Sequence, residues 1–152
     1  MALSIRERDV RNAIHDLLEA TGAYDGIYRT GLPEDRGERA GQTRVVVVEP
    51  DQTNQAEPWD DTSGDLVMTC RLAVTFLARH EDPQIRDETA ELLLNVAANA
   101  LNGRSLAGLT LPSSTRFRSW SWQKPTAPER RIRAVLEYQY LIPGWTGAAT
   151  TE

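Results

Sequence analysis

The chain has 152 residues, the size of one ordinary domain, and its formal net charge of -5 argues against a surface dedicated to nucleic-acid phosphates, which needs clustered lysine and arginine. Its single cysteine, Cys70, cannot form a disulfide within the chain, and no apolar run reaches the roughly 18 residues that a membrane span requires. The first residues lack the basic and apolar regions of a secretory signal, so we expect a globular protein without a membrane partner.

A helix is predicted near the start of the chain. Ser4, followed three residues later by Glu7, has the pattern of a capping box, and apolar residues then recur at helical spacing. These apolar residues are Val10, Ala13, Ile14, Leu17 and Leu18. Gly22 ends the pattern, which predicts a helix over about residues 5–20.

Strands and loops are predicted over the next fifty residues. GIYRT has the composition of a short strand, and the charged, glycine-rich segment 31–42 that of a loop. TRVVVVEP predicts a buried strand, and the polar segment 50–64, with two prolines, a long loop. Residues 65–79 alternate in hydrophobicity, which predicts a long strand with one face in the core. That face consists of Leu66, Met68, Cys70, Leu72, Val74, Phe76 and Ala78.

The most strongly helical segment follows this strand. Asp82 is suited to the N-cap and Pro83 to the first helical position, while Asn102 and Gly103 end the pattern. The segment between them is amphipathic, which indicates a helix that packs on a sheet. Its predicted apolar stripe consists of Ile85, Leu92, Leu93, Val96, Ala97, Ala100 and Leu101.

Two further strands are predicted, TRFRSWSWQ and RRIRAVLEYQYLI, joined by a turn that contains two prolines. One face of the second consists of Ile132, Ala134, Leu136, Tyr138, Tyr140 and Ile142. This order of elements predicts an α+β fold, with a mainly antiparallel β-sheet and two helices packed on one face. We expect a single domain over residues 1–145 and a flexible tail over 146–152.

Candidate catalytic and metal-binding residues are few. GRSLAG follows a helix and lacks the lysine of a phosphate-binding loop, and Ser105 within it has no evident base. His15 lies beside the apolar stripe of the first helix, where a structural imidazole is expected. His80, Glu81 and Asp82 could bind a divalent metal. Alternatively, Asp82 caps the helix and Glu81 favours its positive end, and this is the interpretation that we expect.

The acidic loop EPWDDTSGD is a second candidate metal site. Its oxygens, from Asp60, Asp61 and Asp65, are spaced loosely enough for calcium but not in EF-hand order, so a solvated loop is expected. Cys70 is expected to be buried and unreactive. Because no nucleophile with a base, no metal cluster and no cofactor loop emerges, we expect a protein that is not an enzyme and has no cofactor.

The stretch TRFRSWSWQK interleaves basic and aromatic residues. By strict alternation these share one face of a strand, on the side away from the helices: Arg116, Arg118, Trp120, Trp122 and Lys124. Such a face could bind nucleic acid, but the net acidity of the chain favours a protein interface. We assign the first four residues to this interface, together with Trp59 in the acidic loop.

The order of elements resembles the tail terminator and related tail-completion proteins of long-tailed phages, the lambda U-type family. The resemblance rests on a helix that starts at Asp82 and Pro83, a glycine turn after it, and a final alternating strand over 131–142. The matching residues at the end of the helix and in the turn are Ala100, Leu101, Gly103, Leu106, Gly108 and Leu109. The resemblance covers the order of elements from residue 5 to residue 142, and its motifs are structural.

In this family the implied role is a ring, commonly sixfold, that caps the tail tube, stops its polymerisation and joins the tail to the head. The resemblance thus implies a virion protein of the phage neck that is made in the host cytoplasm. Its implied partners are its own copies, as a hexamer, the tail tube protein and the head-tail connector protein. Genomic DNA would pass through the ring without sequence-specific binding.

Two alternatives stay open. One is another neck or connector ring protein. The other is a small α+β ligand-binding or enzymatic domain that uses Cys70, His80 and the acidic loop. In either ring role, segments 31–42 and 50–64 would contact adjacent subunits or the next ring.

Overall fold

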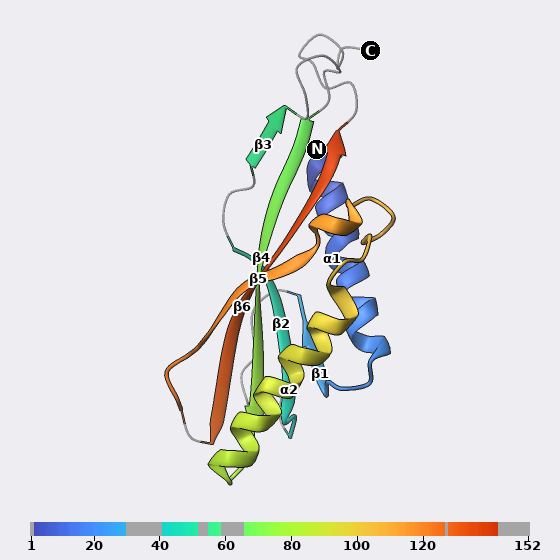
Figure 1. Cartoon of the computed structure of the whole chain (residues 1–152). Coiled ribbons are helices and arrows are strands. Elements are labelled where there is room, and N and C mark those ends of the chain that lie inside the picture. Colours follow the sequence, from blue (N-terminus) through green and yellow to red (C-terminus); the bar gives the residue numbers. More distant parts are fainter. Residues whose placement is uncertain (1, 30–40, 52–54, 59–65, 127, 143–152) are drawn as a thin grey trace.

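Two long helices lie on the same side of a sheet in the computed structural model, which describes residues 2–29, 41–51, 55–58, 66–126 and 128–142 (Figure 1). The helices are α1 (Ala2–Ala20) and α2 (Pro83–Leu101). The strands are β1 (Gly26–Tyr28), β2 (Arg44–Pro50), β3 (Gln55–Pro58), β4 (Leu66–Arg79), β5 (Arg116–Trp122) and β6 (Glu129–Ile142). A short 3-10 helix, η1 (Pro112–Ser114), precedes β5. The predicted α+β fold with both helices on one face is confirmed.

The sheet formed by the described residues is mainly antiparallel. Its order is β1-β2-β4-β6-β5, and β1, which is parallel to β2, is the exception. β4 and β6 pair along their whole length, from Leu66 opposite Ile142 to Arg79 opposite Glu129. β2 pairs with the second half of β4, and β3 pairs with its first half. β4 and β6 are therefore the two central strands of the sheet: β2 and β3 pair with β4, and β5 pairs with β6. Both run the full length of the sheet in Figure 1.

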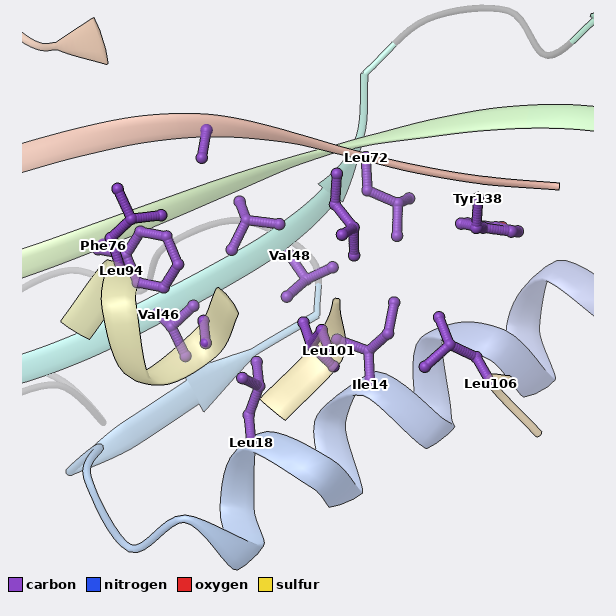
Figure 2. Close-up of a cluster of buried hydrophobic side chains, with 14 of the residues drawn as sticks. Ile14, Leu18, Val46, Val48, Leu72, Phe76, Leu94, Leu101, Leu106 and Tyr138 are labelled. Atoms are coloured by element: carbon purple, nitrogen blue, oxygen red, sulfur yellow. The ribbon is translucent and has the colours of Figure 1, made fainter. Parts of the chain in front are cut away.

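The core fills the space between the helices and one face of the sheet. Val10, Ile14 and Leu18 recur every fourth residue along α1, and all three are fully buried. Figure 2 shows Ile14 and Leu18 pointing from α1 toward the sheet. The sheet contributes alternate residues of its two long strands, as predicted: Cys70, Leu72, Val74, Phe76 and Ala78 from β4, and Ile132, Ala134, Leu136, Tyr138 and Tyr140 from β6.

Two predictions of local structure differ from the observed fold: the start of the first helix and the content of the loop 50–64. α1 begins at Ala2, so Ser4 lies within the helix and not at its predicted start. The predicted loop 50–64 contains strand β3, because its backbone pairs with β4 although its sequence is polar and contains proline. The other parts of that loop, at 52–54 and 59–64, lie outside the described residues, as do residues 31–40 and the predicted tail 146–152.

α2 begins at the predicted residue, but it buries a different side of the helix from the one that the sequence predicted. The Asp82 carboxylate accepts a hydrogen bond from the Gln84 amide at 2.9 Å, which confirms the N-cap. The buried residues are Ala90, Leu93, Leu94, Ala97 and Leu101, whereas Ile85 and Leu92, which were predicted on the apolar stripe, are 43% and 49% exposed. The small side chains of Ala90 and Ala97, one turn to either side of Leu93 and Leu94, let this side of the helix approach the sheet. No helix in the described ranges is long and apolar enough to cross a membrane.

Candidate functional site

The face of the sheet opposite the helices, hereafter the open face, carries a band of charged side chains. Residues that pair directly across antiparallel strands point to the same side, so Arg71 of β4 and Glu137 of β6 meet on this face. Two positions along, Gln139 donates a hydrogen bond to the Thr69 hydroxyl at 3.0 Å. Around these pairs the face is polar, whereas at its β2 side Val45, Val47 and Leu77 form a second, smaller cluster of buried apolar side chains.

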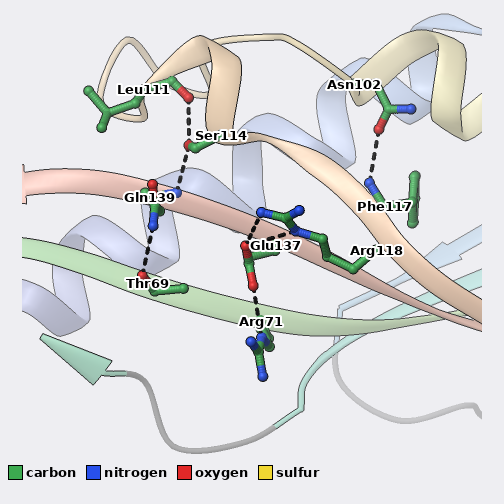
Figure 3. Close-up of polar contacts among 9 residues, drawn as sticks. All are labelled: Thr69, Arg71, Asn102, Leu111, Ser114, Phe117, Arg118, Glu137 and Gln139. Carbon is green, nitrogen blue, oxygen red and sulfur yellow. Dashed lines mark hydrogen bonds and ion pairs between the residues drawn. The ribbon is translucent and has the colours of Figure 1, made fainter.

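Glu137 is the centre of this band (Figure 3). Its carboxylate is almost completely buried and accepts hydrogen bonds from Arg71 Nε and Arg118 Nε, both at 2.9 Å. A second nitrogen of Arg118, Nη2, also lies 2.7 Å from the Glu137 carboxylate. Burial alone raises the pKa of Glu137, but the hydrogen bonds and charges of the two arginines outweigh burial and hold the pKa below its ordinary value. Glu137 is therefore negatively charged near neutral pH, and two arginines share it.

A second ion pair adjoins this triad. Arg133 pairs with Asp51, which follows the end of β2. Asp51 and Ser119, together with the triad and Val135, line a shallow depression of about 530 Å³. The side chains of Arg71, Arg118 and Arg133 are 44%, 42% and 40% exposed, whereas Glu137 and Asp51 are only 7% and 17% exposed. The charge that this surface presents to solvent is thus mainly positive.

A β-bulge brings Arg118 into the triad. β5 pairs Phe117 with Leu136 and Ser119 with Val135, so Arg118 is the extra residue between them. Just before the bulge, the Phe117 amide donates to Asn102 Oδ1 at 3.0 Å, which ties the start of β5 to the end of α2 (Figure 3).

The prediction that Arg116, Arg118, Trp120 and Trp122 share one face of the sheet is wrong. The bulge reverses the alternation of β5, so Trp120 and Trp122 pair with Ala134 and Ile132 and point to the side that bears the helices. Arg118 remains on the open face, and Arg116, exposed and paired with Glu137, shares that face. The predicted continuous Arg and Trp face does not exist. Lys124 lies beyond the end of β5, and Trp59 lies outside the described residues.

The two tryptophans have different environments. Trp122 is half-buried, packs against the core, and has the Arg130 guanidinium 4.3 Å from its ring centre. Arg130 Nε also lies 3.3 Å from Asp87 of α2, so Trp122 belongs to a link between the sheet and the helix. Trp120 packs edge-on against Trp122, with ring centroids 6.1 Å apart, and is 50% exposed.

The other residues that the sequence offered as catalytic or metal-binding candidates are buried or make local contacts. Cys70 is buried in the core, and burial raises the pKa of its thiol to about 12. His80 Nδ1 accepts a hydrogen bond from the Asp82 amide at 2.9 Å, so His80 stabilises the start of α2. Ser105 donates to the Thr110 carbonyl at 2.9 Å. His15 is half-buried on α1, with its Nδ1 atom 3.5 Å from Asp16.

The structure gathers no cluster of metal ligands among its described residues. Within the ranges that it describes, no three His, Cys, Asp or Glu side chains lie close enough to hold a metal ion. The candidate calcium ligands Asp60, Asp61 and Asp65 lie outside those ranges.

Sequence reasoning did not single out Arg71, Glu137, Arg133 or Asp51. The only local signal was the recurrence of charged residues at the odd positions of two otherwise apolar strands. Which of them meet is decided by the register between strands, and Arg71 and Glu137, which meet, lie 66 residues apart in the chain.

Comparison with known proteins gives a structural match but no sequence match. No protein-family model matches the chain, and no curated protein sequence matches it. Among solved structures, 27 chains are similar. One of them belongs to the virion of a native gene transfer agent particle: it has 13% sequence identity, a TM-score of 0.58, and a match that covers 87% of this chain and 94% of that chain. At this identity the match establishes a shared fold.

Proposed function

We propose that this chain is a virion structural protein, and specifically a tail terminator: a ring subunit that caps the tail tube, stops its polymerisation and joins the tail to the head connector. The observation that carries the proposal is the fold shared with a chain of a gene transfer agent virion. Since the match covers 87% of this chain and 94% of that one, little of either chain lies outside the shared fold.

The chemistry of the described residues favours a structural role over a ligand-binding or catalytic one. The depression on the open face is shallow, and its carboxylates are already bonded to arginines. Cys70 is buried, and His80 and Ser105 are engaged in structural hydrogen bonds. We therefore propose that the protein acts through its surfaces, without catalysis and without a cofactor.

The proposed partners follow from this role. Copies of the chain would form a closed ring, with six subunits as the expected number, between the tail tube protein and the head-tail connector protein. Genomic DNA would pass through the ring without sequence-specific contacts. The protein would be made in the host cytoplasm and reside in the virion neck.

The experiment that tests the proposal measures where the protein lies and in how many copies. Native mass spectrometry of the purified protein, together with cryo-electron microscopy of particles, is expected to reveal a closed ring at the junction of tail and head. A protein that is monomeric in solution and in the particle would contradict the proposal.

A deletion distinguishes a terminator from another neck ring. Particles assembled without this chain are expected to have tail tubes of uncontrolled length, because nothing stops the polymerisation of the tube. Tails of normal length that fail to attach to heads would instead assign the chain to another connector ring.

A further inference from the structure

The outer surface of the helix layer has the opposite charge to the open face. Residues 7–20 and 81–101 contain nine carboxylates and three arginines. Asp9, Asp16 and Glu19 of α1 are exposed, as are Glu81, which precedes α2, and Glu88 within it. One side of the molecule is therefore acidic, and the opposite side presents arginines.

A ridge on α2 concentrates this charge around apolar side chains. Ile85, Glu88 and Leu92 follow one another at spacings of three and four residues, so they lie on one line of α2, and Glu81 lies just before the N-cap Asp82. These four residues are hereafter called the α2 ridge, and the three within the helix face away from the buried stripe of α2. No arginine or lysine of the described ranges pairs with either of its glutamates.

Among the described residues the ridge has a local hydrogen bond on its own helix, from Gln84 Nε2 to Glu88 Oε1 at 3.1 Å, and its apolar side chains are exposed. The structure describes three exposed large hydrophobic side chains, and Ile85 and Leu92 are two of them. The third, Trp120, is on the same side of the sheet. An apolar centre with a charged rim is the composition of a protein interface, and a partner for this one must combine apolar surface with positive charge.

The open face has this composition. The side chains of Arg71, Arg118 and Arg133 are 44%, 42% and 40% exposed although each is ion-paired, and the apolar side chain of Val135 lines the depression beside them. Guanidinium groups form planar, two-pronged hydrogen bonds with carboxylates such as those of the α2 ridge. The open face and the α2 ridge are thus complementary in charge and in polarity.

We propose that the α2 ridge of one copy binds the arginine band of the open face on the next copy. The inference rests on the proposed function, because it identifies the surfaces that join the subunits of the ring. The two surfaces lie on opposite sides of the sheet, so one copy cannot use both on the same neighbour (Figure 1). Such head-to-tail contacts continue from copy to copy until rotation closes them into a ring.

Two variants, each impaired on one surface, test this pairing. Glu81→Lys/Glu88→Lys reverses the charge of the ridge at two exposed positions. Arg118→Gln/Arg133→Gln removes two positive charges from the open face but retains side-chain N–H donors for Glu137 and Asp51. Asp9→Lys/Glu19→Lys is the matched control for the ridge variant, since it makes the same change in charge on α1.

Sedimentation velocity is expected to show at least about tenfold weaker self-association for each of the first two variants and wild-type behaviour for the control. Mixing the two impaired variants should produce a dimer and nothing larger, because only one intact pair of surfaces remains. Circular dichroism and thermal unfolding check that each variant is folded. Folded variants that assemble like the wild type would overturn the surface assignment and leave the ring itself intact.

Crosslinking tests the same contact inside particles, where a ring could form even if the purified chain is monomeric. Leu92→Cys/Ser119→Cys places one thiol on the ridge and one in the depression, while Cys70 is buried. A short bismaleimide is expected to yield a ladder of covalent oligomers from the double variant, and no ladder from either single variant.

The crosslinking outcomes separate the two proposals. A ring seen by microscopy without a ladder would refute the α2 ridge contact, whereas no ring at all would refute the proposed function. If Arg118→Gln/Arg133→Gln weakens DNA binding and leaves assembly unchanged, the arginines serve nucleic acid and the inference is wrong.

Discussion

Glu137 carries a negative charge in the middle of a sheet because two arginines hold it there. A nearly buried carboxylate without partners would be protonated or would destabilise the fold. Here Arg71 and Arg118 satisfy both of its oxygens and keep their own outer edges in water. The triad thus fixes the positions of two exposed guanidinium groups, which is what a binding surface for carboxylates needs.

We predict that Glu137→Gln lowers the free energy of unfolding by about 1–2 kcal/mol at pH 7, because it removes two charge-assisted hydrogen bonds to arginines that solvent partly screens. The pKa of Glu137 is lowered on folding, so its contribution is present above the unfolded-state value of 4.5 and is lost as pH falls through the folded-state pKa. Urea unfolding of both proteins at pH 7 and at about pH 3 measures this.

The difference between the two proteins should shrink at the lower pH. Glu88→Gln, at an exposed site of α2, is the control and should change stability by no more than about 0.5 kcal/mol. If the variant and the wild type lose stability in parallel on acidification, the charge of Glu137 does not contribute as described.

Metal removal is expected to leave the fold unchanged. His80 and Asp82 stabilise the start of α2 through hydrogen bonds with backbone amides, so a metal ion is not needed to hold them. Differential scanning calorimetry with and without excess EDTA should give the same melting temperature. A decrease of several degrees that calcium or zinc restores would reveal a metal site.

At the scale of elements, local signals predicted the helices and long strands, and contacts distant in the chain decided the rest. The start of α2 follows from Asp82 and Pro83 alone, which are neighbours in sequence. The rotation of α2 does not, because three consecutive leucines at 92–94 allow more than one apolar stripe. Strand β3 was missed since its polar residues are ordered by pairing with β4 and not by their own hydrophobicity.

The bulge in β5 had the largest effect on the candidate site. Alternation places Arg118 and Trp120 on one face only if no residue is inserted between them, and a bulge has no reliable signature in a single strand. Pairing with β6 and the contact between Arg118 and Glu137 separate the two side chains. This is why the fold class could be predicted and the composition of its surfaces could not.

The separation of the tryptophans predicts unequal effects of substitution. Trp122→Ala removes a half-buried ring from the core and from the Arg130 guanidinium, so a loss of about 2 kcal/mol is expected. Trp120→Ala truncates a ring that is 50% exposed and should cost less than about 1 kcal/mol. Urea unfolding of the two variants gives both values.

Trp122→Phe is the control, since it retains an aromatic ring against the core. It should recover much of the stability that Trp122→Ala loses. Equal losses for Trp120→Ala and Trp122→Ala would mean that the bulge does not divide the two rings in this way.

At the scale of the whole molecule, the sheet separates two surfaces of opposite character. The helices cover one face (Figure 1) and present carboxylates outward, whereas the described part of the other face presents arginines around Glu137 and buries Val45, Val47 and Leu77 at its β2 side. A molecule with such an arrangement attracts its own copies in one orientation and repels them when like faces meet. The proposed ring would therefore obtain its direction, as well as part of its stability, from charge.

This arrangement predicts how salt affects assembly. Ions screen the attraction between exposed charges over about 8–10 Å at physiological ionic strength, and over about 3 Å at 1 M. We expect the self-association constant of the wild type to fall by at least about tenfold between roughly 0.05 M and 0.5 M NaCl. Sedimentation velocity at several salt concentrations measures the decrease.

The variants determine whether this salt effect arises at the proposed contact. Asp9→Lys/Glu19→Lys should depend on salt as the wild type does, because its changes lie on α1. Glu81→Lys/Glu88→Lys should associate weakly at low salt and should not weaken further as salt rises, since the attraction that salt screens is already gone. Association of the wild type that strengthens with salt would instead indicate that apolar side chains such as Leu92 and Trp120 dominate the contact.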